Sequence, residues 1–267
     1  MTKLNIHKLF YKDYFASPIR TGRKEEKNLS FSFDGLHEIN TQIISSKYEM
    51  FKQQAEELKI ASASTISLTT KYPGLLVGAG YDHETHSDNE LKLGFSFDFT
   101  TGLPIIPGSS IKGILRSAFR KKINNKPYAL AKALLAEINV DLTEEQCEML
   151  EIELFGSSEN NEQSILERDI FYDAIIDPLH VGLFLGNDYI TPHRNRTHPE
   201  MSPYTNPIPL PFLKIKPNVK LIFQFGLKNR TSQLLNNKQR LDFYKKTLKL
   251  LGVGAKTRLG YGKFKDE

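Results

Sequence analysis

The sequence is short of cysteine, of long hydrophobic runs and of any strong charge imbalance, and each shortage excludes a class of protein. Its single cysteine, Cys147, can form no intramolecular disulfide and cannot supply a zinc site built on several thiolates, which favours a reducing compartment. Residues 1–10 lack the apolar core and cleavage site of a signal peptide, and no apolar run approaches the ~20 residues that a membrane span requires. We therefore expect a cytoplasmic protein with no membrane contact.

What the sequence does contain is typical of a folded protein. Its 267 residues are 39% hydrophobic and include 17 Phe and 11 Tyr, which predicts a globular core and excludes a disordered tail. This length fits one large domain or two small ones, and a single elaborated domain over residues 1–267 is the simpler interpretation.

The charges are unevenly distributed along the chain, although the net charge is only +5. Residues 103–122 hold five basic side chains and no acid, whereas residues 133–167 hold ten acids and no Lys or Arg. This segregation predicts one basic surface and one acidic insertion. Solvated faces without a function are the competing explanation for either run.

Apolar periodicity predicts the main elements. Steps of three and four predict helices at about 41–60, at 111–122, within the acidic insertion at about 127–167, and at 233–251. Alternation predicts strands at 64–72, 91–99, 168–177 and 219–227, followed by a short closing strand. Strong local signals accompany the helices: Ser109-Ser110 as N-caps, a capping box from Thr143, and Gly252 as a C-cap.

The order strand, helix, strand, strand, helix, strand predicts an α+β fold with a ferredoxin-like (RRM-like) antiparallel sheet and helical insertions. Two polar stretches fall outside this pattern. Residues 78–89 are expected to form an exposed loop, and residues 185–211, rich in Pro, Asn and His, are expected to form a long functional or interface loop.

The glycine-rich run at 252–262 contains Lys256-Thr257 but is not a P-loop, because Ala255 precedes the lysine and the run follows a helix. Two interpretations remain open. Gly254 and Gly260 could let an RNA backbone approach, with Lys256 and Arg258 supplying charge. Alternatively, the run is a glycine-rich helix end and a bulged last strand. Its final residues only approximate the base-stacking motif of RNA-recognition modules, so we expect backbone and shape contacts.

Two histidine clusters are ambiguous. His83 and His86 could serve a metal site or metal-free RNA cleavage, but their spacing demands neither, and a solvated polar loop is the third explanation. His193-Arg194, with Arg196 and His198 nearby, could contact RNA, contact another subunit or simply be exposed. No metal or cofactor is expected.

Three segments together resemble the RAMP superfamily of CRISPR-associated RNA-binding proteins. Residues 102–116, GLPIIPGSSIKGILR, resemble the characteristic segment of its effector-complex members. Leu154-Phe155-Gly156 with residues 171–174 is similar to the next landmark, and residues 252–262 fit the superfamily's C-terminal glycine-rich loop. Thr191-Pro192-His193 and the proline-rich residues 207–212 resemble the sixth-subunit family of Cmr-type (type III-B) effector complexes.

The resemblance implies an RNA-binding subunit with a ferredoxin-like domain. Its implied partners are guide (CRISPR) RNA near the 3′ end, target RNA, and sibling Cmr subunits, especially the repeated backbone subunit. Lys112, Arg116, Lys256 and Arg258 inherit an RNA-facing role as matched positions, and Arg120 continues the same stripe of the helix. We also expect Lys112 and Arg116 to support the glycine-rich loop.

The resemblance also implies that this subunit is not catalytic. Target cleavage in such complexes is attributed to backbone subunits, whose aspartate precedes the Gly-x-Pro segment, and the corresponding place here falls near Lys92 with no clear counterpart. The alternative is a metal-independent endoribonuclease that processes guide precursor, since that group shares the glycine-rich loop.

Overall fold

A computed structural model describes residues 4–15, 18–21, 30–33, 35–78, 83, 90–120, 127–156, 168–191, 209–229 and 234–266. Helices and antiparallel strands are mixed along this part of the chain, which confirms the predicted α+β class. None of the helices in the described ranges is long and apolar enough to cross a membrane.

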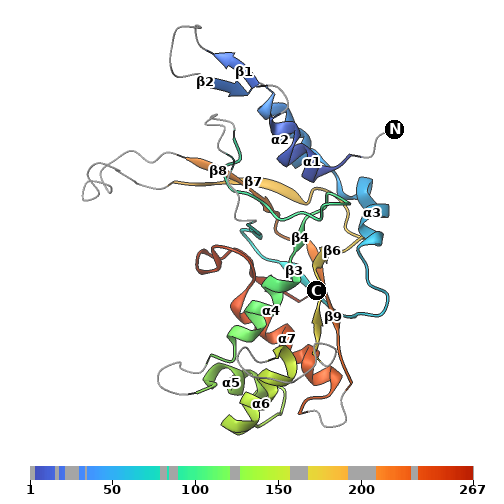
Figure 1. Ribbon diagram of the computed structural model, residues 1–267, viewed down its shortest axis with the longest axis vertical. Coiled ribbons are helices and arrows are strands. Elements are labelled where there is room, and N and C mark those ends of the chain that lie inside the picture. The colour runs from blue at the N-terminus through green and yellow to red at the C-terminus, as the bar shows by residue number, and fades with distance from the viewer. Residues whose placement is uncertain are drawn as a thin grey trace, which may run out of the picture.

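A six-stranded antiparallel sheet forms the centre of the molecule (Figure 1). Its middle strands are β3 (Ser64–Thr70) and β9 (Lys220–Gly226), which pair from Ser64 opposite Phe225 to Thr69 opposite Lys220. Both strands bury alternate apolar side chains, as the sequence pattern predicts. The sheet order is β10-β3-β9-β6-β4, with β5 also paired to β9.

The other strands of this sheet are short: β4 (Ile105–Ile106), β5 (Ile170–Phe171), β6 (Ala174–Ile176) and β10 (Phe264–Lys265). The continuous strand predicted at 168–177 is therefore divided. Phe171 pairs with Phe225 and Ile175 with Ile222. Ile175 therefore follows Phe171 by four residues, whereas their partners on β9 are only three residues apart. An extra residue in one strand is a β-bulge, which bends the strand and re-aims a side chain.

That bulge aims Asp173 at the start of helix α4 (Gly108–Ser117). Its Oδ1 accepts a hydrogen bond from the Gly108 amide at 2.7 Å. A Cβ on Gly108 would lie 2.0 Å from the carbonyl oxygen of Phe171, so only glycine fits here. The helix thus begins before the predicted residue 111, and Ser109-Ser110 lie in its first turn instead of capping it.

Helix α7 (Asn237–Leu251) begins with a capping box between Asn236 and Gln239 and ends at Gly252, whose φ is +77°. The C-cap predicted at Gly252 is confirmed. Arg240 of this helix is buried and donates a hydrogen bond to Asp169 Oδ1 at 2.8 Å. The Tyr244 hydroxyl donates one to Asp169 Oδ2 at 3.0 Å. This polar cluster ties α7 to the residues just before β5.

The acidic insertion forms α5 (Ala129–Ala136) and α6 (Glu144–Phe155), and the capping box predicted from Thr143 is present. Phe119, at the end of α4, packs against Phe155 of α6 and Phe243 of α7, with ring centroids 5.8 and 5.5 Å apart. In Figure 1 the insertion lies beside α4 and α7, away from the N-terminal helices.

The N-terminal region differs from the single helix predicted at 41–60. It contains, in chain order, α1 (Ile6–Tyr11), η1 (Asp13–Phe15), β1 (Pro18–Thr21), β2 (Ser30–Phe33), α2 (Leu36–Ser45), η2 (Tyr48–Phe51) and α3 (Lys52–Glu57). Ser46 and Lys47 are extended, and Lys47 forms a β-bridge with Leu183, so tertiary pairing interrupts the helical periodicity. Tyr48, Phe51 and Ala55 are buried, as predicted.

The prediction of a strand at 91–99 is also wrong. This segment forms only isolated bridges, from Leu93 to Phe212 and from Phe97 to Pro104. Its backbone hydrogen bonds go to several segments instead of to one neighbouring strand: the Lys92 amide donates to the Pro211 carbonyl and the Ser96 amide to the Val77 carbonyl, both at 2.9 Å. The Tyr11 hydroxyl donates to the Phe95 carbonyl and accepts from the Phe95 amide, both at 2.8 Å.

The sequence pattern predicts a long irregular loop at residues 185–211. The two ends of this segment instead pair with each other as strands of a hairpin. Strands β7 (Leu185–Ile190) and β8 (Leu210–Ile215) pair antiparallel in a separate two-stranded sheet, which projects to one side of the molecule in Figure 1. Residues 192–208 lie outside the described ranges.

Candidate nucleic-acid interface

Helix α4 carries a basic surface, the helix surface, formed by Lys112, Arg116 and Arg120. Lys112 is half-buried and Arg120 is exposed. Burial, and then the positive charges of Arg168 and Arg116, lower the pKa of Lys112 below its ordinary value. Like charges that raise each other's energy would be stabilised by a bound anion.

Arg116 is already partly neutralised. Its Nε donates to Glu151 Oε1 of α6 at 2.9 Å, so the acidic insertion folds back onto the helix surface. This ion-pair partner lies on α6 and not on the glycine-rich loop, and the expectation that Arg116 supports that loop stays a prediction. A shallow cavity of about 340 Å³ separates α4 from α6 and is lined by Gly113, Arg116, Ser117, Phe119, Arg120 and Glu151.

Arg168 belongs to this surface although the sequence pattern did not indicate it. It follows the acidic run directly and contributes to the positive potential at Lys112. A Cβ on Gly156 would lie 2.4 Å from Arg168 Cζ, so the glycine makes room for the guanidinium. The Leu154-Phe155-Gly156 segment thus has a physical role, because its glycine leaves the space that the Arg168 side chain occupies.

The glycine-rich loop at 252–262 leaves the C-terminal end of α7 and returns to β10. Three of its glycines are required by packing: a Cβ on Gly252, Gly254 or Gly262 would meet a backbone oxygen at 2.7, 2.2 or 1.8 Å. All three have positive φ. The structural interpretation of these glycines therefore holds, since each is fixed against protein backbone. Gly260 has more room, with its nearest neighbour, Pro73 Cδ, at 3.5 Å.

The cations of the loop face outward. Lys256 is half-buried with φ +58°, and Arg258 is exposed in the 3-10 turn η5 (Thr257–Leu259). Lys71, also exposed, lies in the adjoining turn. Within the described ranges, no ion pair involves Lys71, Lys256 or Arg258, which together form the loop surface.

The loop surface is anchored to the β7–β8 hairpin through Tyr261. The Tyr261 hydroxyl donates to Asp188 Oδ2 at 2.6 Å, and Lys214 Nζ donates to the same oxygen at 2.6 Å. Burial alone would raise the pKa of Asp188, but these two hydrogen bonds, the hydrogen bond from the Tyr189 amide and the Lys214 charge together outweigh it and lower that pKa. Burial and the Asp188 carboxylate raise the pKa of Tyr261.

Of the two histidine clusters, the structure describes only His83, which is not brought to either surface. His83, expected in an exposed loop, is 5% exposed, and its ring lies 4.5 Å from Phe10 and 4.6 Å from Tyr14 between centroids. Packing against α1 explains this burial. His86, His193 and Arg194 lie outside the described residues. Among the residues that the structure describes, no three His, Cys, Asp or Glu side chains gather as metal ligands would.

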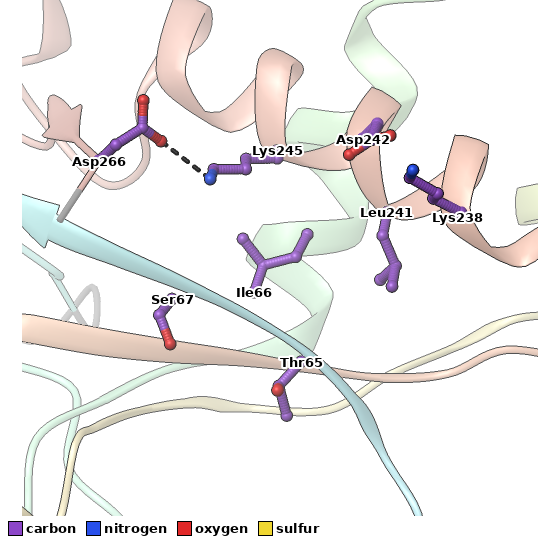
Figure 2. A pocket seen from close by; sticks show the side chains of 8 residues that line it. All are labelled: Thr65, Ile66, Ser67, Lys238, Leu241, Asp242, Lys245 and Asp266. Carbon is purple, nitrogen blue, oxygen red and sulfur yellow. Dashed lines mark ion pairs between the residues drawn. The ribbon is translucent and has the colours of Figure 1, made fainter. Parts of the chain in front are cut away.

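A second cavity, of about 460 Å³, lies between β3 and α7 (Figure 2). Ile66 and Leu241 extend into it, and Lys245 reaches Asp266 in an ion pair of 2.9 Å. Hydrogen bonds from Lys249 and Lys245 lower the pKa of Asp266 to about 2. Because its lysines and aspartates occur in equal number, this cavity lacks the positive excess of the other two surfaces.

Comparison with known proteins gives a family and several relatives. The model of the RAMP superfamily matches residues 67–265, about three quarters of the chain. The "CRISPR system Cmr subunit Cmr6" of Pyrococcus furiosus is 25% identical over an alignment that covers 85% of this chain and 76% of that protein.

Two solved structures match this chain. A chain of the type III-B Cmr-beta complex bound to cognate target RNA has a TM-score of 0.51 and 25% identity, covering 75% of this chain. Only 57% of that longer chain is covered. The crystal structure of Cmr6 from Pyrococcus furiosus has a TM-score of 0.47 and 24% identity, covering 77% of this chain and 98% of that one.

Proposed function

The chain belongs to the RAMP superfamily, and from that premise we propose that it is a non-catalytic RNA-binding subunit of a type III-B CRISPR effector complex. Its task would be to hold the guide RNA near the 3′ end, together with target RNA, beside sibling Cmr subunits and above all the repeated backbone subunit. Similarity to Cmr6 over 85% of the chain is the observation that carries this proposal. A cytoplasmic location accords with it.

The architecture supports the proposal at the level of the core. Elements β3, α4, β6, β9, α7 and β10 follow one another as strand, helix, strand, strand, helix, strand. In the sheet, β3 and β9 lie side by side, with β10 outside β3 and β6 outside β9. We take this arrangement as a single ferredoxin-like domain, with the α5–α6 insertion and the N-terminal helices as additions.

The helix surface and the loop surface are the parts proposed to touch RNA. Lys112, Arg120, Lys256 and Arg258 are available cations for phosphates, and Gly260 leaves space beside them. Gly113 adds to this on α4, because no heavy atom beyond its chain neighbours and the backbone of its own helix lies within 4 Å of the position its Cβ would take. A phosphodiester can approach such bare backbone more closely than it can approach a side chain.

Burial of His83 supports a binding role over a catalytic one. A general base must reach the proton that it removes, and the His83 ring lies inside an aromatic cluster. At Lys92, where an aspartate would be expected in a cleaving subunit, the amine is paired with the buried Glu90. Specific cleavage of a CRISPR repeat transcript by the purified chain would favour the endoribonuclease alternative and overturn this part of the proposal.

The RNA-contact proposal is tested by removing three outward cations at once. We expect Lys112→Ala/Arg120→Ala/Arg258→Ala to weaken RNA binding by the assembled complex. The slope of log K against log salt should fall by about 2, since each lost contact to single-stranded RNA accounts for about 0.7. Filter binding or fluorescence anisotropy at several salt concentrations measures both quantities.

A control variant removes the same number of charges elsewhere. Lys8, Lys59 and Lys246 are surface lysines paired with Asp13, Glu56 and Glu137. Their triple alanine variant should leave affinity and salt slope unchanged. If both triple variants behaved alike, the two basic surfaces would not be the RNA-binding face.

A further inference from the structure

The turn Lys71–Gly74 presents an aromatic ring to solvent at the edge of the loop surface. The Tyr72 side chain is 84% exposed, more than any other large hydrophobic side chain in the described residues. Leu259, 69% exposed, stands in the neighbouring turn η5. The two turns lie close together, because a carbon placed as Cβ on Gly260 would lie 3.5 Å from Pro73 Cδ.

The turn is fixed from two sides. Within it, the Gly74 amide donates to the Lys71 carbonyl at 2.8 Å. On one side, the Gly74 carbonyl accepts from the Gly262 amide at 2.8 Å, and the Lys71 amide donates to the Lys263 carbonyl at 2.8 Å. On the other side, a Cβ on Gly74 would lie 2.2 Å from the carbonyl oxygen of Ile215. The backbone that carries the exposed ring is thus already ordered, so binding of a ligand there loses little backbone entropy.

The charge around Tyr72 identifies the ligand. Its neighbours on the loop surface are the cations Lys71, Lys256 and Arg258, for which the described residues supply no ion pair. The acid on this side, Asp188, is engaged by Lys214 and Tyr261. Protein interfaces are depleted in lysine and in charge at their centres, whereas an aromatic ring among cations is typical of single-strand nucleic-acid binding.

We infer that Tyr72 is a stacking platform for one unpaired base of a single-stranded RNA, with Leu259 as a second apolar contact and Lys71 and Arg258 on the flanking phosphates. This inference rests on the proposed RNA-binding function and adds base contact to what would otherwise be backbone contact alone. The phenol can stack on any base, so the site selects for unpaired bases and not for a particular sequence.

The absence of tryptophan from the 267 residues allows a direct test. Tyr72→Trp introduces a single indole, whose emission should be quenched when single-stranded RNA is added to the full chain or its complex. The quench should be lost with a duplex of the same sequence, and with an otherwise identical strand that lacks bases. Phe99→Trp, at a position 80% exposed beside His7, is the matched control and should report no change.

A binding measurement complements the fluorescence. We expect Tyr72→Ala to weaken binding of single-stranded RNA by about five- to one-hundred-fold, the range for loss of one base–aromatic stack, and Tyr72→Phe to retain affinity. Thermal melting should be unchanged in both variants, because the side chain is exposed.

The outcomes separate this inference from the function beneath it. If anisotropy reported RNA binding by the Tyr72→Trp variant while its indole emission stayed unquenched, the stacking site would be overturned and the RNA-binding proposal would stand. If neither the chain nor its complex bound RNA, the proposed function itself would fail. Emission that changed on adding a sibling subunit, and not on adding RNA, would make the turn a protein contact and would also overturn the inference.

Discussion

The helix surface and the loop surface carry similar numbers of cations but hold them differently. On α4, Arg116 is paired with Glu151 of the acidic insertion, and Lys112 is half-buried beside Arg116 and Arg168. On the loop, the backbone is fixed by close packing, and the charges face solvent. On the helix surface, neighbouring charges restrain the cations, but there is open space at Gly113. On the loop surface, the cations have no ion pairs within the described residues, but the backbone is held rigidly by packing.

The glycines make this contrast measurable. Gly262→Ala places a Cβ 1.8 Å from the Val253 carbonyl oxygen at φ +65°, so we expect it to lower the free energy of unfolding by about 4 kcal/mol. Gly113→Ala meets open space within a helix and should raise stability by up to about 1 kcal/mol. Chemical denaturation of both variants measures the difference, and equal effects would contradict the contrast.

The anchor between the loop and the hairpin should respond to pH. Asp188 has a lowered pKa in the folded protein, so its stabilising contribution is present above the unfolded pKa of about 3.9. That contribution is lost as the pH falls through the folded pKa. Asp188→Asn should therefore cost about 1 kcal/mol at pH 7, a figure discounted for partial exposure.

Denaturation curves from pH 7 to pH 2 supply the measurement for Asp188. The wild type and Asp188→Asn should converge in stability at the acidic end. A gap that stayed constant with pH would mean that the carboxylate charge is irrelevant to the anchor. Asp13→Asn provides a control, because Asp13 pairs with the exposed Lys8 at 3.3 Å and should cost little at any pH.

The smallest expected effect concerns the ion pair between Arg116 and Glu151 on the helix surface. Glu151→Gln removes the partner of Arg116 and should strengthen RNA binding by about two- to five-fold, the energy range of a partly exposed ion pair. Glu148→Gln, on the same helix, changes the net charge equally and serves as the comparison. If both variants raised affinity alike, the gain would come from net charge and not from release of Arg116.

The sequence predicted elements where local periodicity and tertiary burial agree. The alternation of β3 and β9, the Thr143 capping box and the end of α7 at Gly252 are visible in residues close in sequence, and all four elements are present. The strand predicted at 91–99 failed because its backbone pairs with several segments far apart in the chain, which alternation does not encode. The break at 172–173 depends on register against β9, which periodicity does not encode.

The candidate surfaces were predictable in composition but not in detail. The basic residues of α4 and the glycine-rich run stand out in the sequence. The carbonyl that Gly254 faces belongs to Leu76, and the carboxylate that holds Arg116 belongs to α6, so both come from segments far along the chain. Burial of His83 depends on α1 in the same way. The exposure of Tyr72 had one local signal, the Pro73-Gly74 turn that follows it directly after a strand.

The hydrogen bond from the Gly262 amide to the Gly74 carbonyl can form only late in the synthesis of the chain. Residues 71–74 leave the ribosome with most of the chain still to be translated, and the segment that clamps them from one side is made nearly two hundred residues later. The exposed ring therefore cannot be held in place on a nascent chain. An incomplete chain would lack this fixed turn, so the proposed capture of RNA there would require residues 262–263 to be in place.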